Sequence, residues 1–593
     1  MEPRPRPGDA RVRFVANLSP ESAFIINNHR LQGTDSVSRH GIGLWLGQDE
    51  EVTEEAASTN DQRVLSVPTQ VLDGLSGQTL LLSVLRPALR RECLAVIPPD
   101  YELGLLSDLF YAKIDPIFPL LKDEPWEKHG AMETITLKQC ICLVASSDPA
   151  MRPHLRLPHS DTVLSQLEFR ARVAAAVKQT LDLGFIADKI VLLQVCALMS
   201  MYTDDEGFGV LSTHYCALAI LYEQTLGFHV GWPDGRAGGE RSRRIFWCVW
   251  VLDRLNAATN GRPTVIHRRD ADKKVMDSIR DQPPPFKLLI HIAQVLENTI
   301  SLYRPYASES AQKKNPDTFE DLIETASAQN LSSSLLGTAW PFLLRNIGTD
   351  GRIASLELFY LSAVILQDRS SENQSSSELQ QFYATRIVAT ASGESISSLI
   401  YWPVLPYAVT VAASVAYRSL RRSTTPYSRR RAFTLFQDTC KILDDLGKTF
   451  LPARAMARLA RDTMQGVGRA AERIRRDSIK NANIAEDSGA AAEVAVDEST
   501  QEPRDPGQTQ QSAQDSRPPQ PLGAAPAGSP GLYDQFGTDS FHGHTSDAEI
   551  FSNFDPSFDL GRADAIFSAN LDLSMPYFAE DWPVSAHYTG DVG

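Results

Sequence analysis

The sequence predicts an all-α fold: a multi-helix bundle with a partly superhelical layout, followed by a disordered acidic tail. Long apolar segments repeat with the helical period, and we find no series of alternating strands bounded by hairpin turns. With 42% hydrophobic and 22% charged residues, the 593-residue chain can bury a large core. Its length exceeds that of a typical single domain, which indicates several lobes or a folded part with tails.

Seven segments carry the helical pattern in chain order. They are Ile190–Tyr202, Thr213–Leu226, Ile245–Ala258, Phe286–Tyr303, Ile353–Leu366, Leu399–Leu420 and Ala432–Leu446. Within the sixth, Leu399–Tyr417 holds no charge and is the best candidate for a membrane span. Pro403, Pro406 and several polar residues favour a buried core helix instead. Residues 12–48 stay open, because VRFVANL suits a short strand or a loop.

The most informative segment is residues 240–263, which read ERSRRIFWCVWVLDRLNAATNGRP. Its apolar positions cover too much of the circumference for a surface helix, so we expect a helix packed on several sides. Gly261 and Pro263 predict where this helix ends, because Gly tolerates left-handed backbone angles and Pro cannot donate a backbone hydrogen bond.

This segment resembles the middle homology region of fungal zinc-cluster (Zn2Cys6) transcription factors, in which a basic start, a W-x4-D-R helix and a G-R-P turn follow one another. The matching residues are Arg243, Arg244, Trp247, Asp253, Arg254, Gly261, Arg262 and Pro263, with Trp247 one residue further from the Asp than in that pattern. Gly209–His229 is similar to the family's preceding helix with its Leu-Gly-Phe-His end, and Leu109–Leu121 to its opening. Arg13–Ile25 weakly resembles the start of the regulatory region in cutinase-type regulators. The resemblance covers roughly residues 100–460.

The resemblance implies a nuclear transcription regulator, which we expect to control a metabolic or secondary-metabolite gene set. Residues 1–90 would lead into a helical regulatory domain at 91–480. The signature residues Trp247, Asp253, Arg254, Gly261, Arg262 and Pro263 would serve as structural elements. A small-molecule effector and homo- or heterodimerisation stay open, as do the direction of regulation and the target genes.

The zinc module of this family needs six cysteines in two C-x2-C-x6-C halves. The chain has seven scattered cysteines and no C-x2-C. Cys140 and Cys142, two apart on an expected helix, point to different faces and indicate buried thiols. We therefore expect no cofactor in this chain, and zinc only if an upstream six-cysteine module is restored. DNA would be reached indirectly or through that module, and the alternative function is a co-regulator or scaffold without its own DNA contact.

No enzyme motif is present: the chain has no G-x-x-x-x-G-K-[ST], H-E-x-x-H or G-x-S-x-G. Gly41–Gly47 (GIGLWLG) has the wrong spacing for a dinucleotide fingerprint. His154 and His159, like His542 and His544, have no partners at metal-ligand spacing and are expected at the surface. The sequence thus predicts neither catalytic nor metal-binding residues. A helical enzyme with an unreadable site is the second alternative.

Charge is concentrated in the C-terminal part. Residues 481–593 hold nineteen Asp and Glu against three Arg, a net charge of −16, whereas the whole chain carries −15. Residues 481–531 are rich in Ala, Gln, Ser, Pro and Gly and predict a disordered linker. Residues 532–593 interleave acids with aromatics, including Phe567, which is typical of an activation segment that inserts its rings into a partner. The residues expected to carry activation are Phe551, Phe554, Phe558, Phe578 and Trp582. An inert tail, or one that docks back on the body, is the alternative.

Two basic clusters complete the pattern. Arg421 and Arg422, followed by Arg429, Arg430 and Arg431, have the spacing of a bipartite nuclear import signal in a loop between helices. A solvated helix face with a charged loop is the plainer interpretation. A second basic cluster runs from Arg454 to Lys480. Direct DNA binding through phosphate contacts is a minor hypothesis for it. The expected partners are the transcription machinery or a coactivator through the tail, with no membrane.

Overall fold

The computed structural model describes most of residues 87–466 and short parts outside it. The described ranges are 13–16, 37–40, 43–46, 87–158, 162–202, 210–231, 238–303, 317–327, 350–367, 374–423 and 425–466, with the single residues 469, 476, 563 and 567. The expected linker at 481–531 lies outside them, as do the five residues expected to carry activation.

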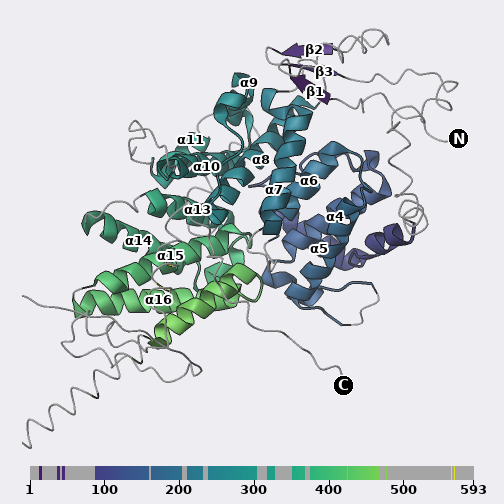
Figure 1. Cartoon of the computed structure of the whole chain (residues 1–593). Coiled ribbons are helices and arrows are strands. Elements are labelled where there is room, and N and C mark those ends of the chain that lie inside the picture. Colours follow the sequence, from purple (N-terminus) through teal and green to yellow (C-terminus); the bar gives the residue numbers. More distant parts are fainter. Residues whose placement is uncertain are drawn as a thin grey trace, which may run out of the picture.

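Helices make up nearly all of the described body (Figure 1). An N-terminal helix spans residues 87–95 and a C-terminal one residues 451–466. Between them lie α3 (Asp100–Leu109), α4 (Ala131–Ala145), α5 (Gln166–Asp182), α6 (Lys189–Met199), α7 (Val210–Leu226), α8 (Gly239–Asn260), α9 (Lys273–Asp277), α10 (Pro284–Leu302), α11 (Phe319–Ser327), α13 (Gly351–Gln367), α14 (Gln374–Thr390), α15 (Val404–Arg422) and α16 (Pro426–Leu446). A five-residue π-helix, Phe110–Ile114, extends α3. The predicted all-α fold is confirmed.

The helices pack in series, largely on their neighbours in sequence. α4 packs on α5 and α6, α6 on α7, and α7 on α8. α10 then contacts α8 on one side and α13 on the other, and α13, α14, α15 and α16 form the second half of the body. Figure 1 shows this progression from the blue α4 and α5 to the green α16. α10 therefore links the two halves.

A small sheet lies outside the helical body. β1 (Arg13–Ala16), β3 (Gly43–Leu46) and β2 (Val37–His40) form an antiparallel three-stranded sheet in that order. β1 contacts α7, so the sheet lies beside the first half, as Figure 1 shows. VRFVANL, for which strand and loop were both open, thus contains a strand. The sheet leaves the helical core unchanged.

Two helices begin at other residues than apolar periodicity predicts, because capping residues and prolines determine where they start. α15 begins at Val404 rather than Leu399, because Pro403 occupies the N-cap position and residues 399–402 are not helical. α16 begins at Pro426 rather than Ala432, since Thr425 caps it by accepting a hydrogen bond from Ser428 N at 3.2 Å. Among the described helices, none combines the length and apolarity needed to span a bilayer.

The core is one continuous cluster of buried apolar side chains that runs through both halves. Trp247 and Trp250 of α8 are fully buried, which confirms a helix packed on several sides. All seven cysteines are buried and free. Burial raises the pKa of the Cys142 thiol to about 12, so this cysteine behaves as an apolar packing residue rather than a reactive thiol.

Candidate functional site

The end of α8 carries the family-like signature, and its backbone explains the glycine. Gly261 has φ 60°, in the left-handed region, and caps the helix. Arg262 N then donates to Ala257 O at 3.1 Å. Pro263 follows, so the chain leaves the helix and returns along α8 at residues 264–266. Further up α8, Trp247 Nε1 donates to Ser278 Oγ at 3.2 Å.

The Asp253 carboxylate holds this returning segment. Val265 N donates to both of its oxygens at 3.1 Å, and Ile266 N donates to Oδ2 at 3.0 Å. Burial raises the pKa of this carboxyl, against the opposing effects of the Arg254 guanidinium and the two backbone donors. An ionised carboxylate can only accept hydrogen bonds, and these donors satisfy the Asp253 oxygens inside the protein.

Arg254 connects the same segment to α10. Its Nη1 donates to Asp253 Oδ2 at 2.9 Å, and its Nη2 donates to Ile266 O and to Glu297 Oε1, each at 2.6 Å. The guanidinium lies 3.8 Å from the centroid of the Trp250 ring, a close cation–π contact. We call Trp250, Asp253, Arg254, Ile266 and Glu297 the signature joint. It fastens α8 to α10, the helix that links the two halves.

The opening motif is also attached to α8. Arg244 Nε donates to Pro119 O at 3.2 Å and its Nη2 to Lys122 O at 2.5 Å. The neighbouring Glu124 is buried and accepts from Arg241 Nη2 of α8 and Gln194 Nε2 of α6, each at 2.5 Å. Burial raises the pKa of Glu124, but the hydrogen bond with His129 at 2.7 Å, together with those from Arg241 and Gln194, lowers it below its usual value. Motifs far apart in the sequence therefore meet on one helix.

Asp115 is a half-buried carboxyl beside this junction. Its Oδ1 has no hydrogen-bond partner within the described part of the chain. Burial raises its pKa from 3.8 to about 6, although Lys122 and Arg244 act in the opposite direction. Because the folded state binds this proton more tightly than the unfolded state does, the contribution of Asp115 to stability is complete below pH 3.8 and is lost as the pH rises through about 6.

Asp115→Asn is therefore expected to stabilise the protein at pH 7.5 but not at pH 4. The amide stays neutral, so the free energy of unfolding should exceed that of the wild type by about 1–2 kcal/mol at the higher pH, after allowance for partial exposure. Urea denaturation followed by circular dichroism at both pH values measures this. An equal difference at both would contradict the assignment.

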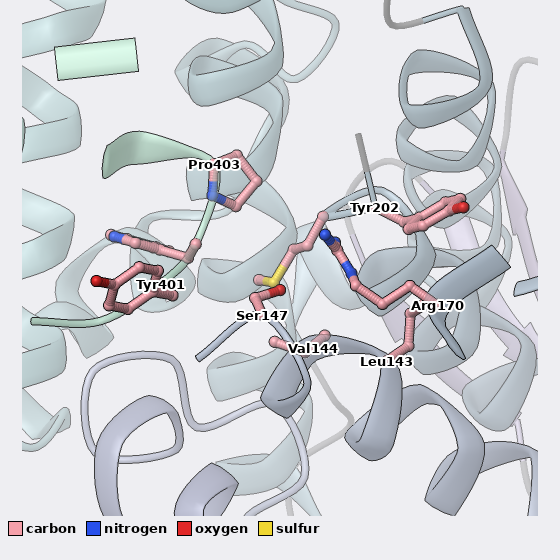
Figure 2. A pocket seen from close by; sticks show the side chains of 9 residues that line it. Leu143, Val144, Ser147, Arg170, Tyr202, Tyr401 and Pro403 are labelled. Carbon is pink, nitrogen blue, oxygen red and sulfur yellow. The ribbon is translucent and has the colours of Figure 1, made fainter. Parts of the chain in front are cut away.

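A closed hollow lies where the two halves meet (Figure 2). Leu143 and Val144 of α4 lie on one side, and Tyr401 and Pro403, just before α15, lie on the other. It leaves no space for a water molecule. Arg170 of α5 fills its rim: Nη1 donates to Thr449 O at 2.7 Å, and the guanidinium lies over the rings of Tyr202 and Phe450 at 5.3 and 5.5 Å. In this conformation the hollow is a packed contact and holds no ligand-sized space.

An open groove of about 560 Å³ lies between α14 and α16. Val388 and Leu435 provide apolar surface and Tyr427 is exposed beside them. Arg430 and Arg431 bring positive charge, whereas the carboxylate of Asp438 in the same lining is paired with Lys441 at 3.1 Å. Its volume falls within the range of small-ligand sites. Its two sides come from different helices, so no single stretch of the sequence indicates it.

The arginines expected to form an import signal lie in other surroundings than predicted. Arg421 and Arg422 end α15, but Arg429, Arg430 and Arg431 lie within α16, so the expected loop position is wrong for them. Thr425 and Pro426 start α16 ahead of the arginines. Arg429 is buried, and this burial lowers its pKa. Arg430 and Arg431 are exposed.

The second basic cluster is partly neutralised by nearby acceptors. Arg461 forms an ion pair with Asp444 of α16, and Arg454 Nε donates to Gly447 O at 3.0 Å. Arg458 is exposed on the same helix. Within the described ranges no group of three His, Cys, Asp or Glu could hold a metal ion. His154 is partly exposed, whereas His159, His542 and His544 lie outside those ranges.

One aromatic residue of the acidic segment is described, and it is not solvated. Phe567 is 1% exposed and packs against α15 and α16, with Ala563 buried beside it. At Phe567 the structure therefore shows the alternative that the sequence left open, a contact of this segment with the body. Apolar contact with the body outweighs hydration of this ring. Phe551, Phe554, Phe558, Phe578 and Trp582 lie outside the described residues.

Comparison with known proteins agrees with the motifs. Residues 142–314 match the fungal specific transcription factor domain. The chain is 25% identical over 199 residues to an uncharacterized transcriptional regulatory protein of Schizosaccharomyces pombe, covering 30% of this chain and 24% of that protein. It is 20% identical over 322 residues to cutinase transcription factor 1 alpha of Fusarium vanettenii, covering 50% of this chain and 35% of that protein. The matched regions thus span about a quarter and a third of these relatives. The chain carries a fungal specific transcription factor domain and is related to fungal transcriptional regulators.

Proposed function

We propose that this protein regulates transcription in the nucleus, with a helical body that senses and an acidic C-terminal segment that recruits the transcription machinery. The observation that carries the proposal is the fungal specific transcription factor domain at residues 142–314. The relationship to a protein named as a cutinase transcription factor favours a metabolic or secondary-metabolite gene set as the target. Nuclear entry would use the arginines at 421–422 and 430–431, since Arg429 is buried in α16.

The body would respond to a ligand only if that ligand binds one conformation better than another. The groove between α14 and α16 is the best place for such a ligand, because it is open and large enough. Val388 and Leu435 suit an apolar skeleton, and Arg430 and Arg431 suit an anionic group on it. A small apolar carboxylate is the chemical class that this lining favours.

DNA contact is proposed to be indirect, through a partner, or through a zinc module outside these 593 residues. Seven cysteines without a C-x2-C pair cannot form the two-zinc cluster within this sequence. A co-regulator that never touches DNA is the second candidate, favoured by the same observation. Sequencing the transcript upstream of Met1 separates the two, because an in-frame C-x2-C-x6-C pattern supports direct contact.

The activation proposal predicts a large loss when the tail aromatics are removed. The full chain, fused to a heterologous DNA-binding domain, should activate a reporter gene. Replacing five residues by alanine should lower that activation by at least about tenfold, since aromatic anchors dominate the binding energy of such interfaces. The five residues are Phe551, Phe554, Phe558, Phe578 and Trp582.

A matched control changes five linker glutamines to alanine, which leaves charge and aromatic content the same. These are Gln508, Gln510, Gln511, Gln514 and Gln520. The control should retain wild-type activation at equal protein level, as checked by immunoblot. If the aromatic variant also retained it, the segment would not be the activating one.

A further inference from the structure

Phe567 occupies a defined aromatic site on the second half of the body. Its ring stacks on Tyr417 of α15, with centroids 4.5 Å apart and planes at 27°. It meets Phe436 of α16 edge-on at 5.5 Å and 74°. Tyr417 and Phe436 also contact each other, at 5.9 Å. We call Tyr417 and Phe436 the ring seat.

Ala563 and Phe567 are both buried. Each has helical backbone, and they are four residues apart in the sequence, the spacing at which two side chains of a helix share one side. Ala563 is 0% and Phe567 1% exposed. A small and a large apolar residue at this spacing form the kind of helical face that docks into a groove on a partner. Here the partner surface belongs to the same chain, more than a hundred residues earlier.

The charges around the ring seat complement those of the segment. Exposed arginines lie on the two helices that carry the ring seat: Arg422 ends α15, and Arg430 and Arg431 precede Phe436 on α16. The segment has Asp559 and Asp564 next to its anchor residues and a strongly negative surrounding sequence. An acidic segment bearing one aromatic anchor therefore fits this basic end of the α15–α16 pair in both shape and sign.

We propose that the ring seat is the docking surface for the chain's own acidic C-terminal segment, with Phe567 as the anchor, and that docking withholds the segment from its activation partner. A ring buried against Tyr417 cannot at the same time insert into another protein. Burial of one phenyl group and one methyl group favours the docked state by a factor on the order of 10 to 100, which a partner of ordinary affinity can reverse. The withholding part rests on the proposed function, whereas the docking part does not.

Hydrogen exchange on the full chain tests the docking. Amides at 563–567 should be protected in the wild type and should lose at least about tenfold of that protection in Phe567→Ala. Phe558→Ala, a matched loss of a phenyl group in the same segment, should leave the protection unchanged. Protection should also fall between 50 and 500 mM salt, because ion screening weakens the charge contribution.

Two exchange results would overturn the proposal. Absence of protection at 563–567 in the wild type would mean that the segment does not dock. Protection equal to that of α8, and lost only on global unfolding, would mean that Phe567 is a permanent part of the core rather than a reversible anchor.

A reporter assay tests the withholding, with the full chain fused to a heterologous DNA-binding domain. Phe567→Ala should raise activation several-fold, whereas Phe558→Ala, which removes one of the rings proposed to activate, should lower it. Equal activation in the wild type and Phe567→Ala would overturn withholding. A reporter that stays silent in every variant would overturn both withholding and the proposed activation, while exchange protection would still decide whether the segment docks.

Discussion

Arg254→Met is expected to lower the free energy of unfolding by about 3–5 kcal/mol, the range for breaking a buried ion pair from one side. Arg254 is fully buried and supplies one donor to Asp253, one to Ile266 O and one to Glu297. Met fills similar space but donates nothing. The Asp253 carboxylate then stays buried without its cation, and the contact with the Trp250 ring is lost.

Arg268→Met is the matched control for this variant. Arg268 Nε donates to the other oxygen of Glu297 at 2.6 Å, but the Arg268 side chain is 45% exposed. An exposed pair of this kind contributes about 0–1 kcal/mol. Urea denaturation of both variants, followed by circular dichroism at 222 nm, measures the difference. Similar midpoints for the two variants would show that the signature joint is not a stabilising contact.

Gly351→Ala is expected to cost about 2–3 kcal/mol of stability, in the range for overpacking a tight site. A Cβ atom on Gly351 would lie 1.9 Å from Ser398 O and 2.4 Å from Ser398 C, which are backbone atoms that no side-chain rotation can move. The same contact is fastened by Ser355: its Oγ donates to Gly351 O at 2.6 Å and accepts from Ile400 N at 2.9 Å. The substitution should therefore displace the segment around residues 398–401. Tyr401 of this segment lines the closed hollow.

Gly104→Ala tests the same chemical change where there is room for it. Gly104 lies inside α3, and an added Cβ would meet nothing within 4 Å. Alanine in a helix interior should stabilise the protein by about 0.5–1 kcal/mol, because it loses less conformational freedom on folding. Thermal melts of the two variants should therefore shift in opposite directions. An unchanged or higher melting temperature for Gly351→Ala would contradict the packing at Gly351.

Apolar periodicity identified seven of the described helices and missed others that also pack in the core. α4 and α5 were not among the seven expected segments. In α4, Gln139 is buried and donates to Cys93 O and Val96 O at 2.7 and 2.8 Å. In α5, Gln166 is buried and donates to Ser146 O at 2.9 Å. A glutamine satisfied by a distant carbonyl looks in sequence like a surface residue, since its partner is set by packing.

Charged residues show the same limit, because the sequence does not tell which of them the fold buries. This holds for the cluster from Arg454 to Lys480 and for the arginines expected to form the import signal. Sequence spacing placed Arg429 with its neighbours in an open basic cluster, whereas the fold buries Arg429 and leaves Arg430 exposed. Three consecutive residues on a helix point about 100° apart, so they cannot share one environment. Whether a charged side chain meets water or protein therefore depends on which neighbour covers that side of the helix.

The sequence alone determined the all-α class, the helical unit of α8 with its glycine stop, and the separation of an almost neutral body from an acidic segment. These features are local: period, capping chemistry and charge are properties of adjacent residues. Tertiary structure alone decided that Arg254 reaches Glu297, that Gly351 has no room for a methyl group, and that Phe567 stacks on Tyr417. Each of these depends on a contact between elements distant in the chain, and packing, not periodicity, selects which surfaces meet.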